Sequence, residues 1–233
     1  METELKLSLR QQDVPALLAH PLLATSAKVQ RLLNTYFDTP ALDLKQRRMA
    51  VRERLAGDQW LLTVKTAGKS ENGLSRRQEW EAPTTPGALD FAALVDDANL
   101  AASLMALRAE LKPLFSTDFE RHSWVLTHNS ASIEVALDQG HITVPGTALS
   151  EGILELELEL LSGPEAALHA LADALRHAHS GLLAGGASAV AAIYPMTNTD
   201  ASPISYAMDP LEQLRAQKVP VEQLVFPDEI HGF

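Results

Sequence analysis

Charged and apolar residues alternate along several short segments of this sequence, and this alternation constrains the fold more than any other feature. In segment 154–160, Glu155, Glu157 and Glu159 alternate with four leucines. Side chains two positions apart on a β-strand point to the same face of the sheet. The segment therefore predicts a strand with one carboxylate face and one leucine face.

The same period of two recurs along the chain, starting with Glu2, Glu4 and Lys6. The other charged residues that follow this period are Arg52 and Arg54, Lys65, Arg77, Glu79 and Glu81, and Glu134 and Asp138. For one strand alone, a solvated outer face over a leucine core is the simpler interpretation. An outward row of three glutamates would repel itself, however. A barrel resolves this conflict, because the apolar faces can pack outward against helices while charges of both signs share a lumen.

The segments between turn residues predict about eight strands with helices among them. Strands are expected at 1–10, 31–38, 47–56, 59–66, 74–82, 114–127, 131–138, 141–144 and 153–161. Turns between them are expected at Gly57-Asp58, Asn129-Ser130 and Gln139-Gly140. Helices are expected after Pro15, twice within 86–111, and at 164–179. This pattern predicts the α+β class, as an antiparallel β-barrel with surrounding helices. The composition changes beyond Asn198, so we expect one domain over 1–198 and a C-terminal appendage over 199–233.

Composition narrows the choice of partners. The chain has no cysteine, no basic-then-apolar leader and no run of 18 apolar residues, which favours a cytoplasmic protein without membrane spans. A formal net charge of −11 disfavours a nucleic-acid partner, because phosphate backbones need a cationic face. Local clusters of Arg and Lys could still bind a small anion. Because Mg²⁺ prefers carboxylates together with phosphates, and Arg matches phosphate oxygens, the lumen could hold a divalent cation and a polyphosphate together.

The motifs of this sequence resemble those of the CYTH domain, the triphosphate tunnel metalloenzymes. Glu2-x-Glu4-x-Lys6 is similar to the ExExK signature of that family. Segments 113–121, 134–140 and 154–163 follow in the order seen in its bacterial inorganic triphosphatase branch. The resemblance implies an eight-stranded antiparallel tunnel that hydrolyses inorganic triphosphate to diphosphate and phosphate with Mg²⁺ or Mn²⁺. A homodimer is plausible for this family.

The resemblance also implies roles for individual residues. Lys6 and Glu4 would be catalytic. The phosphate-binding set would be Lys6, Arg52, Arg54, Lys65, Arg77 and Arg121. The metal ligands would be Glu2, Glu4, Asp138, Glu155, Glu157 and Glu159, and Glu79, Glu81 and Glu134 would complete the lumen.

Two positions depart from the pattern of that branch. Its members carry a Lys and an Arg, three apart, after the last long helix, where this chain has Ala189 and Ala192. Each lost phosphate contact costs about 1.5–3 kcal/mol. The alternatives are therefore an impaired tunnel that binds polyphosphate or nucleotide without turnover, and an activity like that of thiamine triphosphatase or class IV adenylate cyclase.

The end of the chain resembles a different family. Residues 200–233 are similar to the C-terminus of prolyl oligopeptidase-family hydrolases, in which the residue matching His231 belongs to a catalytic triad. The chain has no Gly-x-Ser-x-Gly elbow to supply a nucleophile. We therefore interpret this segment as a remnant of such a sequence and expect no protease activity.

Overall fold

A computed structural model of the chain describes residues 2–71, 74–177 and 194–195. One sheet of eleven strands contains every strand in this part of the chain, and all of its pairs are antiparallel. The strands are β1 (Glu2–Ser8), β2 (Lys28–Asp38), β3 (Ala50–Ala56), β4 (Gln59–Lys65), β5 (Lys69–Glu71), β6 (Leu74–Arg77), β7 (Glu79–Pro83), β8 (Lys112–His128), β9 (Ala131–Thr143), β10 (Ser150–Ser162) and β11 (Tyr194–Pro195).

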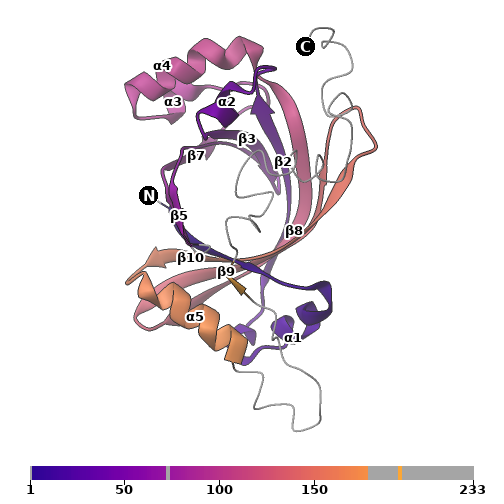
Figure 1. Cartoon of the computed structure of the whole chain (residues 1–233), viewed down its shortest axis with the longest axis vertical. Helices are drawn as coiled ribbons and strands as arrows, with labels where there is room; N and C mark the ends of the chain where they lie inside the picture. Colours follow the sequence, from indigo (N-terminus) through magenta and orange to yellow (C-terminus); the bar gives the residue numbers. More distant parts are fainter. Residues whose placement is uncertain (1, 72–73, 178–193, 196–233) are drawn as a thin grey trace.

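Nine of these strands form a nearly closed barrel, seen end-on in Figure 1. The order runs β6-β1-β10-β9-β8-β2-β3-β4-β7, and β6 and β7 follow each other in the chain across Gln78. β5 and β11 extend the sheet by pairing with β6 and β1. The barrel class is thus confirmed, with nine strands where about eight were expected. The strand predicted over 74–82 is interrupted at Gln78, and two predicted strands, 131–138 and 141–144, are one strand.

Helices cover the barrel on two opposite sides (Figure 1). The helices are α1 (Val14–Leu18), α2 (Asp43–Gln46), α3 (Phe91–Leu94), α4 (Ala98–Leu107) and α5 (Ala166–His177), with short 3₁₀ turns at Gln11–Asp13, Pro21–Leu23 and Arg108–Glu110. α5 packs on β1 and β10, whereas α3 packs on β7 and on α4. Side chains of Asp90 and Asp97 accept backbone N–H bonds at the starts of α3 and α4, which fixes where these helices begin.

Apolar strand faces pack outward against these helices, as the alternation predicts. Leu5, Leu156 and Leu158 are completely buried in one cluster with Leu168 and Leu171 of α5. A second cluster packs the outer faces of β3 and β4 against α2, α3 and α4. Each fully buried leucine contributes about 1.5–3 kcal/mol. The opposite faces of the same strands must therefore look into the barrel.

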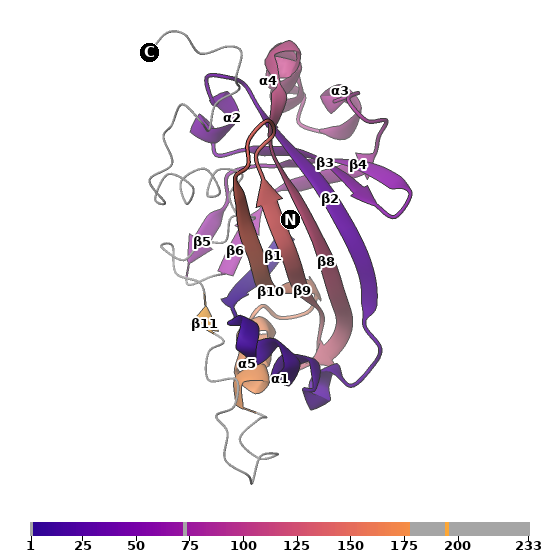
Figure 2. The same cartoon turned by 90° about the vertical axis from the view of Figure 1, so that its right-hand side faces the viewer.

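A third apolar cluster lies on the inward faces of the long strands. It consists of Leu32, Tyr36, Leu114, Phe115, Phe119, Ile142, Val144 and Ile153. Phe119 stands two residues before Arg121, and Ile153 two residues before Glu155, so the apolar and charged positions share one strand face. Figure 2 shows the long, curved strands β2, β8, β9 and β10 that carry this cluster. The interior is thus divided into an apolar region and a charged region.

Some expected boundaries differ from the structure. Segments 131–138 and 141–144 are one strand, β9, which passes through Gly140 without a break. A Cβ at Gly140 would lie 2.1 Å from the carbonyl oxygen of Asp118, so glycine is present because β8 approaches closely there. The turns at Gly57-Asp58 and Asn129-Ser130 are confirmed, with positive φ at Gly57, Asn129 and Ser130. Short elements α2 and β5 were not expected.

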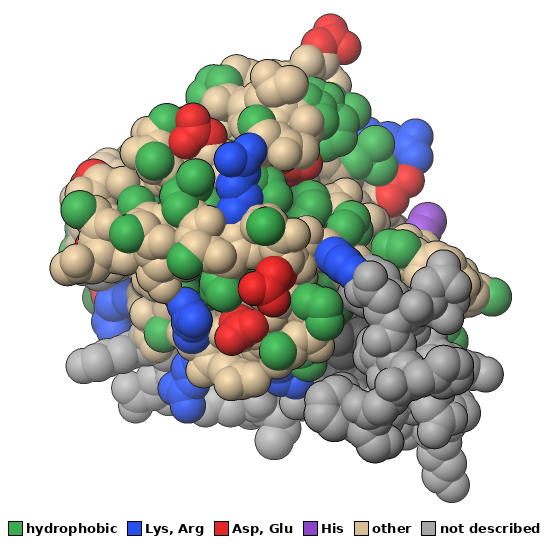
Figure 3. Space-filling model, turned by 90° about the horizontal axis from the view of Figure 1, so that it is seen from above, with side chains coloured by type: hydrophobic (Ala, Val, Ile, Leu, Met, Phe, Trp, Pro, Cys, Tyr) green, Lys and Arg blue, Asp and Glu red, His purple; other side chains and the backbone are tan. Residues whose placement is uncertain are grey.

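The outer surface over α3 and α4 carries scattered charges of both signs among apolar groups (Figure 3). None of the helices in the described ranges is long and apolar enough to cross a membrane. The concentration of charge inside the barrel therefore identifies the region to examine for function.

Candidate functional site

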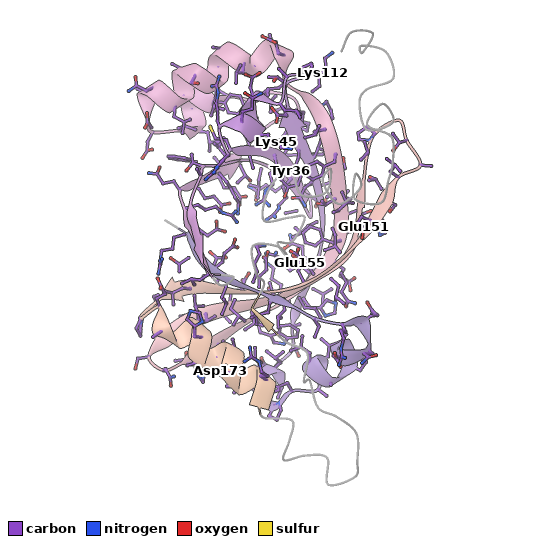
Figure 4. All side chains as sticks on the ribbon, viewed as in Figure 1. Tyr36, Lys45, Lys112, Glu151, Glu155 and Asp173 are labelled. Atoms are coloured by element: carbon purple, nitrogen blue, oxygen red, sulfur yellow. The ribbon has the colours of Figure 1, made fainter. Side chains whose placement is uncertain are left out.

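A cavity of about 400 Å³ occupies the charged part of the barrel interior. Its lining combines seven carboxylates with six cationic side chains and three other residues. The lining residues are Glu2, Glu4, Glu79, Glu81, Glu134, Glu157, Glu159, Lys6, Lys65, Arg52, Arg54, Arg77, Arg121, Tyr36, Thr63 and Ala50. Figure 4 shows side chains extending into the ring from several strands, with Tyr36 and Glu155 labelled on different walls.

Three carboxylates form a row across neighbouring strands at one part of the lining. Strand register places Glu159 of β10 opposite Glu4 of β1 and opposite Glu134 of β9. Glu134 and Glu159 form no ion pair with any residue in the described ranges. Burial raises the pKa of Glu159 to about 7, and the carboxylates of Glu2 and Glu134 add to this rise. Within this row only Glu4 is paired, with Arg77, so Glu134 and Glu159 are left as two neighbouring carboxylates without an ion-pair partner among the described residues.

Two cations hold the carboxylates at the beginning of β1. Nε of Arg77 donates to Glu2 over 3.0 Å, and its Nη2 donates to Glu4. Nζ of Lys65 lies 3.0 Å from Glu2 and 2.9 Å from Glu79. Burial alone would raise the pKa of Glu2, but Lys65 and Arg77 outweigh burial and hold that pKa far below its usual range. Glu2 therefore stays ionised at neutral pH.

Lys6 and Arg121 share the carboxylate of Glu157. Nζ of Lys6 donates to one oxygen of Glu157, and Nη2 of Arg121 donates to the other over 2.7 Å. Burial alone would lower the pKa of Lys6, but Glu157, Glu4 and Glu155 raise it above its usual range. Arg121 also donates two hydrogen bonds, of 2.7 and 2.6 Å, to Asp138. Lys6 is therefore a permanently charged donor within the cavity.

Asp138 and Glu155 lie behind the cavity lining. Asp138 is completely buried and Glu155 is 2% exposed, and neither borders the cavity. Asp138 fixes the guanidinium of Arg121, whereas the carboxylate of Glu155 lies 3.6 Å from Nζ of Lys6 and accepts no hydrogen bond from a described residue. Burial raises the pKa of Glu155 to about 8, although Lys6 opposes the shift. Both residues sit where they can support the lining cations.

Arg52 belongs to a row of polar side chains on the opposite wall. Its Nε donates to Oγ1 of Thr63 over 3.2 Å, and Oγ1 of Thr63 donates to Glu81 over 2.7 Å. Burial alone would lower the pKa of Arg52, but Tyr36, Glu79 and Glu81 together raise it. Like Lys6, this guanidinium remains charged and paired.

Arg54 differs from the other five lumen cations because it forms no ion pair with a described carboxylate. Its Nε donates to Oδ1 of Asn34 over 2.7 Å. Burial, together with the positive charges of Arg52 and Arg121, lowers the pKa of Arg54 to about 10. Among the lumen cations, Arg54 is therefore the least compensated by carboxylates and the best placed to receive an anion.

The carboxylates of the lining suit a hard divalent cation by their chemistry. Such ions take carboxylate oxygens, which Glu2, Glu4, Glu157 and Glu159 all present. Within the described residues no three carboxylate or imidazole side chains converge closely enough to hold an ion as they stand. Arg77, Lys65 and Lys6 hold Glu2, Glu4 and Glu157, while Glu159 has no ion-pair partner among the described residues. The lining carboxylates thus fit a divalent metal ion that would share them with the Lys and Arg side chains of the lumen.

The structure brings most of the predicted site residues together. Thirteen of the fifteen predicted positions line one cavity, and the other two, Asp138 and Glu155, lie directly behind it. Ala189 and Ala192 lie outside the described residues, as does the segment 199–233. The individual roles predicted for these residues stay predictions.

The charge pattern of the sequence did not identify the uncharged polar members of the site. Tyr36 and Thr63 line the cavity, and Asn34 and Thr117 lie behind Arg54. Asn34 and Tyr36 stand two apart on β2, so the period of two was present there as well. A search restricted to charged residues could not find it.

A barrel whose interior presents carboxylates, guanidiniums and ammonium groups around one cavity defines a charged β-tunnel protein. Residues 1–194 match the model of the CYTH domain family. The chain therefore belongs to the CYTH domain family. The likeness to prolyl oligopeptidases in the C-terminal segment receives no support from these comparisons.

One relative agrees with this assignment, and two solved structures share the fold. Over 171 residues, 70% of this chain, it is 36% identical to an inorganic triphosphatase of Haemophilus influenzae, and the match covers 46% of that protein. The chain thus spans about half the length of this relative. A putative adenylyl cyclase from Hippeastrum, described as having a dominant triphosphatase activity, superposes with a TM-score of 0.57 at 22% identity, covering 96% of this chain and all of the other. A putative adenylate cyclase from Bacillus halodurans superposes with a TM-score of 0.50 at 18% identity, covering 75% of this chain and 89% of the other. At these identities the two structures support the fold alone.

Proposed function

We propose that this chain hydrolyses inorganic triphosphate to diphosphate and phosphate inside the charged tunnel, with Mg²⁺ or Mn²⁺ as cofactor. The observation that carries the proposal is the cavity itself, in which six cationic side chains and seven carboxylates face one another. A polyanion alone would be repelled by the carboxylates, and a metal ion alone would be repelled by the cationic side chains. A polyphosphate bound together with a divalent cation complements both sets.

The lining favours an inorganic chain over an organic triphosphate. Tyr36 is the one aromatic side chain of the lining, and its ring stacks on Phe115 with centroids 4.5 Å apart. It is also 3% exposed, so it offers little free face for a base or a thiamine ring. This observation favours triphosphate over thiamine triphosphate and ATP, the substrates of the alternative activities.

The chain's own residues would act mainly through charge and position. In the reaction a water molecule attacks a terminal phosphorus, the bond to the bridging oxygen breaks, and diphosphate leaves. Arg54, Arg52 and Arg121 would neutralise charge on the phosphate oxygens, which is the main demand of phosphoryl transfer. Lys6, kept protonated by its carboxylate neighbours, would donate hydrogen bonds to a phosphate oxygen and cannot serve as a base.

The metal ligands we propose are Glu2, Glu4, Glu157 and Glu159, which line the cavity. A bound divalent cation would add positive charge at the phosphate oxygens. We assign Asp138 and Glu155 to supporting Arg121 and Lys6, because both residues lie behind the lining. The cytoplasmic location, the homodimer and the absence of nucleic-acid or membrane partners stay predictions from the sequence.

The test is phosphate release from inorganic triphosphate, thiamine triphosphate and ATP, each with Mg²⁺, with Mn²⁺ and with EDTA. We expect metal-dependent release from triphosphate, and its loss in Glu4→Ala. Glu120→Ala provides the control, because Glu120 is an exposed carboxylate on β8 that lies outside the cavity lining. Triphosphate binding without phosphate release would instead support the binding-module alternative raised by Ala189 and Ala192. Faster turnover of an organic triphosphate would contradict the proposed substrate.

A further inference from the structure

A buried chain of two hydrogen bonds lies behind Arg54. Nε of Arg54 donates to Oδ1 of Asn34 over 2.7 Å, and Nδ2 of Asn34 donates to Oγ1 of Thr117 over 2.8 Å. Asn34 and Thr117 are each 1% exposed, and neither borders the cavity. Strand register places Asn34 of β2 opposite both Arg54 of β3 and Thr117 of β8. These two hydrogen bonds therefore link three neighbouring strands, from Thr117 in the barrel wall to Arg54 at the lumen.

This arrangement uses one nitrogen of Arg54 and leaves the other two available. The guanidinium is planar, so a hydrogen bond from Nε restricts the direction of the whole group. The terminal nitrogens of Arg54 make no hydrogen bond with a described residue, and no described carboxylate pairs with them. Because Arg54 lines the cavity, its unpaired terminal nitrogens belong to the lumen side of the group. Two parallel N–H donors of this kind suit a phosphate group.

The residue type at position 34 fits this task. The amide of Asn34 is neutral, so it accepts from Nε without cancelling the charge of Arg54. Its NH₂ group is satisfied by Thr117, which fixes which way the amide faces. An aspartate would accept the same bond but would place a buried negative charge against the guanidinium. An aliphatic side chain would leave Nε of Arg54 without a partner.

We propose that Asn34 is a positioning residue that orients Arg54 for binding one phosphate of a linear polyphosphate, with Thr117 fixing Asn34 in turn. The proposal rests on the function proposed above. The other lumen cations are paired with carboxylates, so a phosphate would compete with those carboxylates for them. Arg54 has no such partner among the described residues and can contact the anion directly. Asn34 then acts on the substrate through Arg54 alone.

The test is a double-mutant cycle on triphosphate affinity. Titration calorimetry with inorganic triphosphate in EDTA, which prevents metal-dependent turnover, would be run on the full chain as wild type, Asn34→Ala, Arg54→Ala and the double variant. We expect Arg54→Ala to weaken binding roughly 10- to 100-fold, as for a lost charge-assisted hydrogen bond. Asn34→Ala should weaken it about 2- to 10-fold, because it removes the bond that orients Arg54 but keeps the charge of Arg54. The double variant should bind no more weakly than Arg54→Ala.

Two further variants make the result decisive. Asn34→Asp keeps the size and the acceptor but cancels the charge of Arg54, so it should bind triphosphate more weakly than Asn34→Ala does. Should Asn34→Ala fail to fold, Asn34→Asp and Arg54→Ala supply the comparison. Thr35→Ala is the matched control, because Thr35 lies next to Asn34 on β2, faces away from the lumen, and its hydroxyl lies 3.4 Å from that of Ser116 on β8. It should leave affinity unchanged.

Unchanged affinity in Asn34→Ala, or losses that add in the double variant, would overturn the positioning role. In that case the wild-type chain would still bind and hydrolyse triphosphate, so the proposed function would stand. A wild-type chain that neither binds nor hydrolyses triphosphate would overturn the proposed function and this inference together.

Discussion

At the scale of single residues, the site is organised by charges that are placed close together before any ligand binds. Glu4, Glu159 and Glu134 stand side by side across β1, β10 and β9, although like charges at opposed sheet positions are destabilising. Apolar residues there would be more stable. A cation bound at this row, as the proposed function requires, would offset the repulsion.

The titration of Glu159 gives a prediction for stability against pH. Its pKa is about 7 in the folded chain against an ordinary 4.5, so the native state holds more protons than the unfolded state between these values. The free energy of unfolding should therefore fall as pH rises through this window in EDTA. Glu159→Gln should reduce that fall and, at pH 8, stabilise the chain by roughly 0.5–1 kcal/mol.

Urea unfolding at pH 5 and pH 8 measures this difference. At pH 5 the wild type and Glu159→Gln should be similarly stable, because Glu159 is mostly protonated in the native state. Glu120→Gln changes an exposed carboxylate on β8 and should show no pH-dependent gain. A Glu159→Gln variant less stable than wild type at pH 8 would contradict the interpretation that the carboxylates of Glu159 and Glu134 repel each other.

A second residue-scale prediction compares two Arg–Asp pairs of similar geometry. Asp138 is fully buried and accepts two hydrogen bonds from Arg121, whereas Asp118 accepts two from Arg31, whose side chain is 70% exposed. Removing one partner of a buried pair costs about 3–5 kcal/mol, and an exposed pair contributes about 0–1 kcal/mol. Asp138→Ala should thus destabilise strongly and Asp118→Ala weakly in urea unfolding. Equal losses would show that Arg121 does not depend on Asp138.

The charged residues of the site could be predicted from sequence because each charge is visible on the strand period. The period of two also runs through Asn34 and Tyr36, but their roles could not be predicted, because these depend on register between distant strands. Asn34 reaches Arg54 twenty positions away and Thr117 eighty-three positions away. No local pattern reports that pairing.

At the scale of elements, the close contact between β8 and β9 depends on Gly140. A Cβ there would lie 2.1 Å from the backbone oxygen of Asp118 and 2.5 Å from Cα of Phe119. Backbone atoms cannot move aside as a flexible side chain can. Gly140→Ala should therefore destabilise the chain by roughly 1–3 kcal/mol, as overpacking does.

Gly152 on β10 is the matched control for this prediction. A Cβ there meets nothing within 4 Å, and its φ lies outside the left-handed region. Gly152→Ala should be neutral or stabilising by up to about 1 kcal/mol, because alanine restricts the unfolded chain. Thermal unfolding of both variants measures the contrast, and similar melting temperatures would contradict it.

The same glycine explains an error at the level of elements. Glycine in a polar context indicates a turn, and the sequence predicted one at Gln139-Gly140, where β9 in fact continues. Conversely, the strand predicted over 74–82 is interrupted at Gln78, where no turn residue stands. Both outcomes are set by neighbouring strands: β8 at Gly140, and the change of partner from β1 to β4 at Gln78. Alternation along one segment carries no information on these neighbours.

At the scale of the whole molecule, the barrel divides its interior between packing and binding. Phe115, Phe119 and Ile142 fill one part with apolar side chains that are nearly or completely buried. The charged remainder encloses about 400 Å³. The outward leucine faces and their helices hold this arrangement in place, so the lumen charges need not contribute to stability themselves. Stability should therefore respond to a ligand that compensates them.

This dependence gives the last prediction. A ligand that binds only the native state stabilises it by about 2.7 kcal/mol at a hundredfold excess over Kd. Triphosphate with Ca²⁺, chosen to test binding with a cation of similar ligand preference, should raise the melting temperature more than either component alone. The reason is that triphosphate compensates the Lys and Arg side chains while Ca²⁺ compensates the carboxylates, so both sets of charges are neutralised at once. Glu4→Ala should lose most of the extra shift, and Arg54→Ala should lose the part due to triphosphate. Strictly additive shifts from the two components would show instead that metal and polyphosphate bind independently, and that the tunnel does not couple its two sets of charges.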